Sequence, residues 1–179
     1  MKRAWWAMVI AVPLIFVLAK GFSGAPNSSA GTLVGQRAPS FTLHTLDGRQ
    51  LSLSRFYGHP VVLNFWASWC QECKNEHPYL LSLDRNFQHE GVTMLGVTYN
   101  DSAGSARSFI RDRGAPWPAL RDPSGRTAIA YGVTGVPETF VIDAQGVIRF
   151  HTAGPVRPGA PVTPEQLGRQ VRRALQEPA

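Results

Sequence analysis

The chain has 179 residues, a length that suits one well-buried domain and little more. Its formal net charge is +6, and half of that charge comes from Lys2, Arg3 and Lys20 in an N-terminal segment without acidic residues. The rest of the chain has no run of Lys and Arg interleaved with aromatic residues, which argues against a nucleic-acid-binding protein. The two cysteines are the only ones in the chain, so none remains for a separate structural disulfide.

Residues 1–22 have the pattern of a membrane anchor. Lys2-Arg3 precedes the apolar stretch Ala4–Ala19, which Lys20 closes. A helix rises about 1.5 Å per residue, so one from Ala4 to Phe22 would span about 28 Å, close to the hydrocarbon thickness of a bilayer. Because the preceding positive charges stay inside, everything after Lys20 is predicted to be exported. A cleaved secretory signal is the alternative, and it exports the rest of the chain as well.

Residues 23–35 are rich in Ser, Gly, Ala and Pro, a composition typical of a flexible linker. The folded domain is therefore predicted over residues 36–179. Its first elements are a β-hairpin around Asp47-Gly48, two buried strands and two helices. In chain order, these elements cover Phe41–Leu43, Leu51–Leu53, Val61–Ala67, Cys70–Phe87, Val92–Val97 and Ala103–Arg113, with Gly114 as the C-cap of the second helix.

The second half of the domain is predicted to contain a short helix, a second hairpin and a last helix. These elements cover Ser124–Tyr131, Glu138–Asp143, Val147–His151 and Pro164–Gln176, with Thr163 as the cap of the last helix. The run Val61–Ala67 does not alternate between apolar and polar residues, which is typical of a central strand covered on both faces. The order of elements predicts an α/β domain with a central mixed sheet, helices on both faces and a leading β-hairpin.

Cys70 and Cys73 lie three positions apart, directly after the buried strand and at the start of the first helix. In this arrangement one thiol attacks a disulfide and the other resolves the product. Unpaired amides and the helix dipole favour a thiolate in the first turn, so we expect Cys70 to attack, with an exposed sulfur, and Cys73 to lie deeper. Exchange passes through a mixed disulfide on Cys70, which Cys73 then breaks.

Other uses of two close cysteines fit the sequence less well. A structural zinc site takes four ligands, and the five histidines show no matching spacing. Covalent haem attachment needs a histidine directly after the second cysteine, where this chain has Lys74. An inert structural disulfide stays open, although a short ring is a weak covalent constraint. We therefore predict no metal and no cofactor other than the redox-active pair.

Two residues beside the cysteines have two interpretations each. Glu76 lies one helical turn past Cys73. If it is buried, its pKa rises and its carboxylate can exchange a proton with Cys73; otherwise it is a solvated helix charge. Trp69 is either a hydrophobic wall beside Cys70 or part of the ordinary core.

The segment Gly135-Val136-Pro137-Glu138-Thr139 provides further candidates. A proline that opens a strand can adopt the cis form and expose the carbonyl before it, although trans is far commoner. Val136 could then bind an extended substrate peptide beside Cys70 through its backbone. Glu138 is either a charge at the edge of the sheet or an acid that faces the thiols.

Three segments give the chain a family resemblance: 62–70, 73–78 and 131–140. With them it resembles thioredoxin-fold proteins and, more narrowly, the membrane-anchored thiol:disulfide interchange proteins of bacterial cytochrome c maturation (the CcmG/DsbE type). The resemblance covers about residues 35–176 and the anchor. It implies a thioredoxin-like fold, a cis Pro137 that faces the disulfide, Glu76 as the acid that tunes the thiols, and Glu138 as a second acid near the site.

The resemblance also implies a place and partners. The protein would be a single-pass protein of the bacterial inner membrane with its catalytic domain in the periplasm. It would take electrons from a membrane thiol reductase and reduce a disulfide of apocytochrome c or of its thiol chaperone.

The sequence also departs from the family. Many relatives have proline after the first cysteine, whereas this chain has Gln71, and Gln71-Glu72 resembles the broader TlpA/ResA-like reductases. A general exported disulfide reductase is therefore one alternative. A copper-delivery module on the same fold is another, with His151 as its only late histidine.

Overall fold

The computed structural model describes residues 33–177. The predicted anchor over residues 1–22, and the predicted linker up to residue 32, lie outside the described residues. Within residues 33–177, none of the helices has both the length and the apolar character that crossing a bilayer requires.

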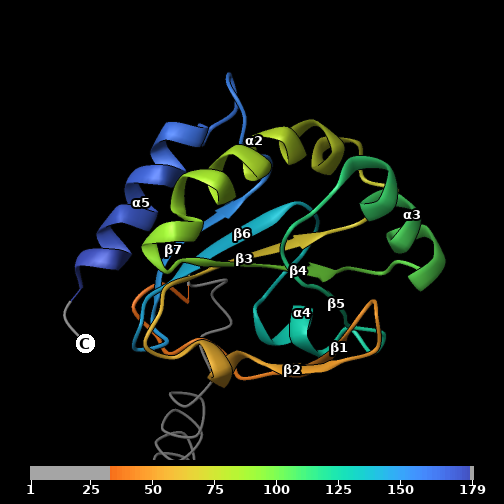
Figure 1. Ribbon diagram of the computed structural model, residues 1–179, viewed down its shortest axis with the longest axis horizontal. Coiled ribbons are helices and arrows are strands. Elements are labelled where there is room, and N and C mark those ends of the chain that lie inside the picture. The colour runs from red at the N-terminus through yellow and green to blue at the C-terminus, as the bar shows by residue number, and fades with distance from the viewer. Residues whose placement is uncertain (1–32, 178–179) are drawn as a thin grey trace, which may run out of the picture. The chain divides into compact units, whose positions relative to one another are not determined.

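The described residues form a mixed sheet of seven strands in the order β2-β1-β5-β4-β3-β6-β7 (Figure 1). β3 runs parallel to β4, and β4 parallel to β5, whereas the other neighbouring strands are antiparallel. The strands are β1 (Thr42–Thr45), β2 (Gln50–Ser52), β3 (Val61–Trp66), β4 (Thr93–Thr98), β5 (Ala119–Arg121), β6 (Glu138–Ile142) and β7 (Ile148–Ala153). The predicted mixed sheet with a leading hairpin is confirmed.

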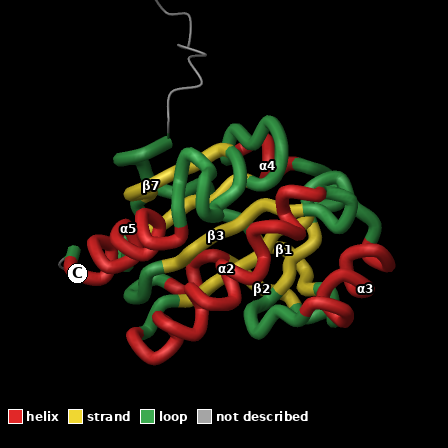
Figure 2. The backbone as a smooth tube through the Cα atoms, turned by 90° about the horizontal axis from the view of Figure 1, so that it is seen from above, coloured by secondary structure: helices red, strands yellow, loops and turns green. Residues whose placement is uncertain are grey.

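Helices cover both faces of this sheet. α2 and α5 lie side by side on one face, and α4 lies on the other (Figure 1, Figure 2). The helices are α2 (Gln71–Phe87), α3 (Ala103–Arg113), α4 (Arg126–Ala130) and α5 (Pro164–Gln176), with short 3-10 turns η1 (Leu53–Phe56) and η2 (Gln88–Glu90). α3 and α5 begin and end where the sequence predicts, with Gly114 after α3 and the Thr163 capping box before α5.

β3 shows how the sheet divides the core. All six of its residues are buried, and their side chains alternate between the two faces. Leu63 and Phe65 pack in the cluster on the α4 side, whereas Val62 packs with α2 and α5. Trp66, at the end of the strand, packs with Phe109 of α3 at 4.8 Å between ring centroids. This alternation places Asn64 on the α2 side, in the middle of an otherwise apolar strand.

The sequence did not predict β5. This strand has only three residues, and prolines stand close to both of its ends, at Pro118 and Pro123. It is formed by its neighbours, because it pairs with β4 on one side and β1 on the other. Through β5, the leading hairpin becomes part of the main sheet.

Candidate active site

The two cysteines lie at the point where β3 passes into α2. Cys70 is the N-cap of α2, and its sulfur accepts a hydrogen bond from the Cys73 amide at 3.0 Å. Cys70 and Cys73 are joined by a disulfide, so the structure describes the oxidised form. At a helix N-terminus, free amides and the macrodipole stabilise negative charge on the capping atom. The sulfur of Cys70 therefore occupies the position at which a thiolate is most stabilised.

Cys70 is less exposed than the sequence predicts. Its exposed fraction is 5%, against 3% for Cys73, so the expectation of a freely exposed sulfur is wrong for the oxidised form. The reason is packing against a distant segment: the Cys70 sulfur lies 3.5 Å from the carbonyl oxygen of Val136, which is 66 positions further along the chain.

The segment that covers the sulfur ends in a cis proline. The Val136–Pro137 peptide bond is cis, as the family resemblance implies. Pro137 is buried, and its carbonyl accepts a hydrogen bond of 2.8 Å from the amide of Gly154 at the end of β7. The structure thus brings Val136 and Pro137 to the disulfide, with the Val136 carbonyl directed at Cys70.

Glu76 is buried, with an exposed fraction of 1%. One carboxylate oxygen accepts from the Asn64 side-chain amide and the other from the backbone amide of Val156, each at 3.0 Å. Burial raises the pKa of Glu76 to about 7, although both hydrogen bonds act to lower it, and the nearby charge of Glu72 adds to the increase. The solvated-charge interpretation is therefore wrong, and the buried one holds.

Glu76 and Cys73 share a small internal cavity. Its volume is about 10 Å³, and Asn64 and His77 also line it. A site that holds one water molecule needs roughly 10–15 Å³. The carboxyl group and the resolving sulfur therefore border a space of about the size through which a single water could pass a proton.

Glu138 is buried, with an exposed fraction of only 3%. One oxygen accepts from the amides of Thr134 and Gly135, at 2.9 and 3.3 Å, and the other contacts His151 Nε2 at 2.7 Å. Burial alone would raise the pKa of Glu138, but these bonds outweigh it and lower the pKa below its ordinary value. The polar contacts of Glu138 are thus with the loop before Pro137 and with β7.

Trp69 lies at the surface beside the disulfide. Its exposed fraction is 56%, which excludes the ordinary-core interpretation. The indole N–H donates to the carbonyl of Asn100 at 3.0 Å, and the amide of Ser68 donates to Asp101 at 2.6 Å. These contacts tie the turn before Cys70 to the segment that follows β4.

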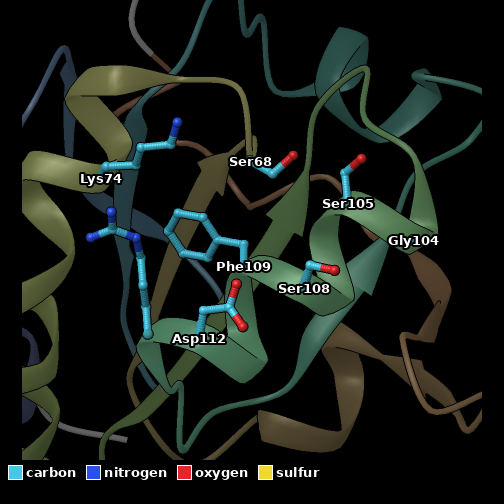
Figure 3. A pocket seen from close by; sticks show the side chains of 8 residues that line it. Ser68, Lys74, Gly104, Ser105, Ser108, Phe109 and Asp112 are labelled. Carbon is cyan, nitrogen blue, oxygen red and sulfur yellow. The ribbon is translucent and has the colours of Figure 1, made fainter.

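A broad hollow of about 740 Å³ lies between this turn and α3 (Figure 3). Ser68 and Lys74 border it on one side, and polar side chains of α3 border it on the other. The α3 residues that line it are Gly104, Ser105, Ser108, Phe109, Asp112 and Arg113. Within residues 33–177, no group of three or more His, Cys, Asp or Glu side chains is placed to hold a metal ion.

The sequence predicts no role in thiol exchange for four residues that shape the site: Asn64, His151, Val156 and Arg157. Arg157 forms an ion pair of 2.9 Å with Glu72, one of the two residues that separate the cysteines in the sequence. Only Asn64 carries a signal that could have been read, because an amide inside the buried run Val61–Ala67 needs a polar partner. The contacts of the other three depend on where loops and β7 lie in the fold.

Comparison with known proteins supports the same kind of site. Residues 34–151 match the model of the AhpC/TSA family. The thiol:disulfide interchange protein DsbE of Escherichia coli is 36% identical over 160 residues, covering 84% of this chain and 82% of that protein. HelX of Rhodobacter capsulatus, also named a thiol:disulfide interchange protein, is 35% identical over 162 residues, covering 82% of this chain and 90% of HelX.

A solved structure gives the same result. The crystal structure of a thiol:disulfide interchange protein DsbE from Chlorobium tepidum superposes with a TM-score of 0.73 at 32% identity, covering 79% of this chain and 97% of that one. The fold is therefore thioredoxin-like, and the disulfide lies where β3 meets α2. The chain belongs to the AhpC/TSA family and, within it, to the DsbE-type thiol:disulfide interchange proteins, and it is a thiol:disulfide oxidoreductase.

Proposed function

We propose that this protein reduces a disulfide of apocytochrome c, or of its thiol chaperone, during cytochrome c maturation. The observation that carries the proposal is the Cys70–Cys73 disulfide at the N-terminus of α2, with the backbone of Val136 on one side and buried Glu76 on the other. The relatives named DsbE and HelX, and the segment Gly135–Thr139, support the narrower pathway over a general reductase.

The reaction moves one electron pair through the two sulfurs. A dithiol of a membrane thiol reductase first reduces the Cys70–Cys73 disulfide: one of its thiolates forms a mixed disulfide with Cys70, and its second thiol breaks that bond. This leaves the Cys70–Cys73 dithiol and a disulfide in the reductase. The Cys70 thiolate then attacks one sulfur of the substrate disulfide, forms a mixed disulfide and releases the other sulfur as a thiol. Cys73 attacks the sulfur of Cys70, restores the Cys70–Cys73 disulfide and releases the second substrate thiol. The substrate gains two electrons and two protons, and the protein loses the same.

Glu76 acts as the acid–base group for Cys73. Cys73 must lose its proton before it can attack Cys70, and an acid–base group is most effective when its pKa lies near the working pH. Burial raises the pKa of Glu76 to about 7, and the shared cavity connects it to Cys73. Glu76 thus accepts the proton of Cys73 during resolution and returns it when the dithiol is regenerated.

Residues 1–22 act in this proposal as a single-pass anchor in the bacterial inner membrane, and residues 23–35 as a linker. The domain over residues 36–179 then works in the periplasm, within reach of a membrane thiol reductase and of exported apocytochrome c. The redox-active pair Cys70–Cys73 is the only redox group that the proposal requires.

A general exported disulfide reductase of the TlpA/ResA type is the second candidate. The observation that favours it is the pair Gln71-Glu72 between the cysteines, where Glu72 is engaged by Arg157 at 2.9 Å. Both candidates use the same chemistry at Cys70 and differ only in the proteins that reach it.

The test is to trap the partners. Replacing the resolving residue, Cys73→Ser, leaves the mixed disulfide on Cys70 unbroken, so partners accumulate as covalent adducts that reducing agents release. We expect apocytochrome c, its chaperone or a membrane thiol reductase in the trap, identified by mass spectrometry. The double variant Cys70→Ser/Cys73→Ser is the matched control and should capture nothing.

Two other results would favour the alternative functions. Many unrelated exported proteins in the adducts would identify the general reductase instead. If the reduced wild-type protein bound Cu(I) tightly at one equivalent and did not exchange disulfides, the copper-delivery alternative would replace both reductase readings.

A further inference from the structure

We propose that His151 is a positioning residue for thiol exchange: acting through Glu138, it fixes the loop Thr134–Pro137 against Cys70. A protein disulfide that approaches Cys70 then meets a backbone already held in place. The inference rests on the proposed reaction of Cys70 with protein disulfides, and it gives His151 a task that neither its sequence position nor the family resemblance assigns.

The loop is held by one buried carboxylate. The amides of Thr134 and Gly135 both donate to the same oxygen of Glu138, at 2.9 and 3.3 Å, and the Thr134 hydroxyl lies 3.5 Å from it. These two residues directly precede Val136, whose carbonyl lies 3.5 Å from the Cys70 sulfur. A shift of the Glu138 carboxylate would therefore pass through two peptide groups to the atom that contacts the sulfur.

His151 is the partner of the other carboxylate oxygen, at 2.7 Å from Nε2. An ionised carboxylate only accepts hydrogen bonds, so Nε2 must carry the hydrogen and donate it. Without this donor, one oxygen of a buried charged group would lose its partner, which costs far more than losing a solvated contact. The donor at position 151 thus keeps Glu138 oriented with its second oxygen toward the loop.

The imidazole ring is itself held rigidly. It stacks on Phe140 of β6 with ring centroids 4.3 Å apart and an interplanar angle of 12°, and Phe140 is almost completely buried. His151 and Phe140 are direct neighbours across the β6–β7 pair. Gly154, the residue directly after β7, donates its amide hydrogen to the carbonyl of Pro137 at 2.8 Å. The loop is therefore held at its first residues by Glu138, which His151 contacts, and at Pro137 by the residue that follows β7.

A matched pair of substitutions separates the donor from the ring. His151→Phe keeps a ring that can stack on Phe140 but removes the N–H donor, whereas His151→Gln removes the ring and keeps an N–H donor. Arg149→Gln is the control on the same strand, because Arg149 pairs with Asp143 and Glu177, away from the loop. Each protein is tested with a peptide disulfide and with neutral hydroxyethyl disulfide, which needs no peptide-binding surface.

We expect His151→Phe to lower the second-order rate constant for the peptide disulfide by about tenfold, since a reacting group misplaced by about 1 Å costs up to 100-fold. Reaction with hydroxyethyl disulfide should change by less than about twofold, because the Cys70–Cys73 chemistry is intact. His151→Gln should recover most of the peptide rate, and Arg149→Gln should match the wild type.

Amide hydrogen exchange gives a readout that does not depend on activity. The amides of Thr134 and Gly135 should exchange faster in His151→Phe than in His151→Gln, because only the former leaves Glu138 free to turn away. If His151→Phe does not fold, His151→Leu replaces it as the variant without a donor.

Three outcomes would overturn the inference alone: His151→Phe matching the wild type with the peptide, both disulfides slowing equally, or His151→Gln failing as badly as His151→Phe. A wild-type protein that reduces hydroxyethyl disulfide but not the peptide would instead contradict the proposed function, and the inference with it. The two failures are therefore distinguishable in one set of measurements.

Discussion

Glu76 borders a cavity with Cys73, and Glu138 binds the loop that contacts Cys70, yet the surroundings of these two buried carboxyl groups move their pKa values in opposite directions. Glu76 and Glu138 have exposed fractions of only 1% and 3%. Burial raises the pKa of Glu76 to about 7, while the pKa of Glu138 is lowered because its hydrogen bonds outweigh its burial. Two carboxyl groups with nearly the same exposed fraction therefore differ in charge state near neutral pH.

Burial acts on both groups, and the donors around each carboxylate add to the difference. Glu76 receives two hydrogen bonds, both from neutral amides, whereas Glu138 receives two backbone amides and the imidazole of His151. Each N–H that donates to a carboxylate stabilises its ionised form, and Glu138 has one more such donor than Glu76. Glu76 is thus suited to gain and lose a proton near neutral pH, and Glu138 is suited to stay ionised and hold a loop.

The largest expected effect is on the pH dependence of stability, and it comes from Glu76. A carboxyl group whose pKa is raised by folding binds more protons in the folded state, so its contribution to stability is complete below pH 4.5 and is lost as the pH rises to about 7. Across this window the free energy of unfolding of the oxidised protein should fall by about 3 kcal/mol. Glu76→Gln should remove this fall in urea unfolding measured at pH 5 and pH 8.

The control for this experiment is Glu138→Gln, which should leave the fall between pH 5 and pH 8 in place. If Glu76→Gln showed the same pH dependence as the wild type, Glu76 would not titrate in this window, and its role in the proton step would have to be abandoned.

A somewhat smaller effect is expected for Glu138→Gln at pH 8. The amide cannot accept at both ends, so it leaves either His151 or the loop amides without a partner. Losing hydrogen bonds to a buried charged group costs about 2 kcal/mol, which urea unfolding can measure. Glu76→Gln also leaves one of its two donors without an acceptor, but it removes a charge that burial disfavours, so it should lose clearly less stability at the same pH. Equal losses in both variants would contradict the contrast between the two acids.

The sequence predicts the helices and strands better than it predicts the surroundings of the two acids. α3 and α5 were placed to the residue, because Gly114 and the Thr163 capping box are local signals. β5 was missed, because three residues gain their strand conformation only from β1 and β4. The expectation of an exposed Cys70 was wrong, because the covering segment at Val136 is remote in the chain.

The spacing of the cysteines predicts their redox role, but the sequence does not predict the burial and charge state of Glu76 and Glu138. The partners of Glu76 are Asn64, 12 positions before it, and Val156, 80 positions after it. Nothing near Glu76 in the sequence distinguishes such a residue from a solvated helix charge. In the sequence, His151 is a single histidine without an evident partner. Its contact with Glu138 depends on the register between β6 and β7, which the sequence does not show.

The smallest expected effect concerns a third acid, Glu72. It is half-exposed, so it shows how an acid near the cysteines behaves when solvent screens its charge. Its carboxylate pairs with Arg157 at 2.9 Å, and the two side chains are 43% and 37% exposed. Because solvent screens such a pair, Arg157→Gln should change the equilibrium with glutathione by only about twofold. The uncompensated charge of Glu72 disfavours a thiolate at Cys70, so the shift should be toward the disulfide.

Salt separates this effect from those of the buried acids. The shift caused by Arg157→Gln should vanish at about 1 M salt, where the screening length is about 3 Å, and in the double variant Glu72→Gln/Arg157→Gln. The pH dependence due to Glu76 should persist at the same salt concentration, because a buried group is screened much less. A shift toward the dithiol in Arg157→Gln, or a shift that persists at high salt, would contradict an effect through the charge of Glu72. Arg157 would then act by shaping its loop, whose Val156 amide donates a hydrogen bond to Glu76.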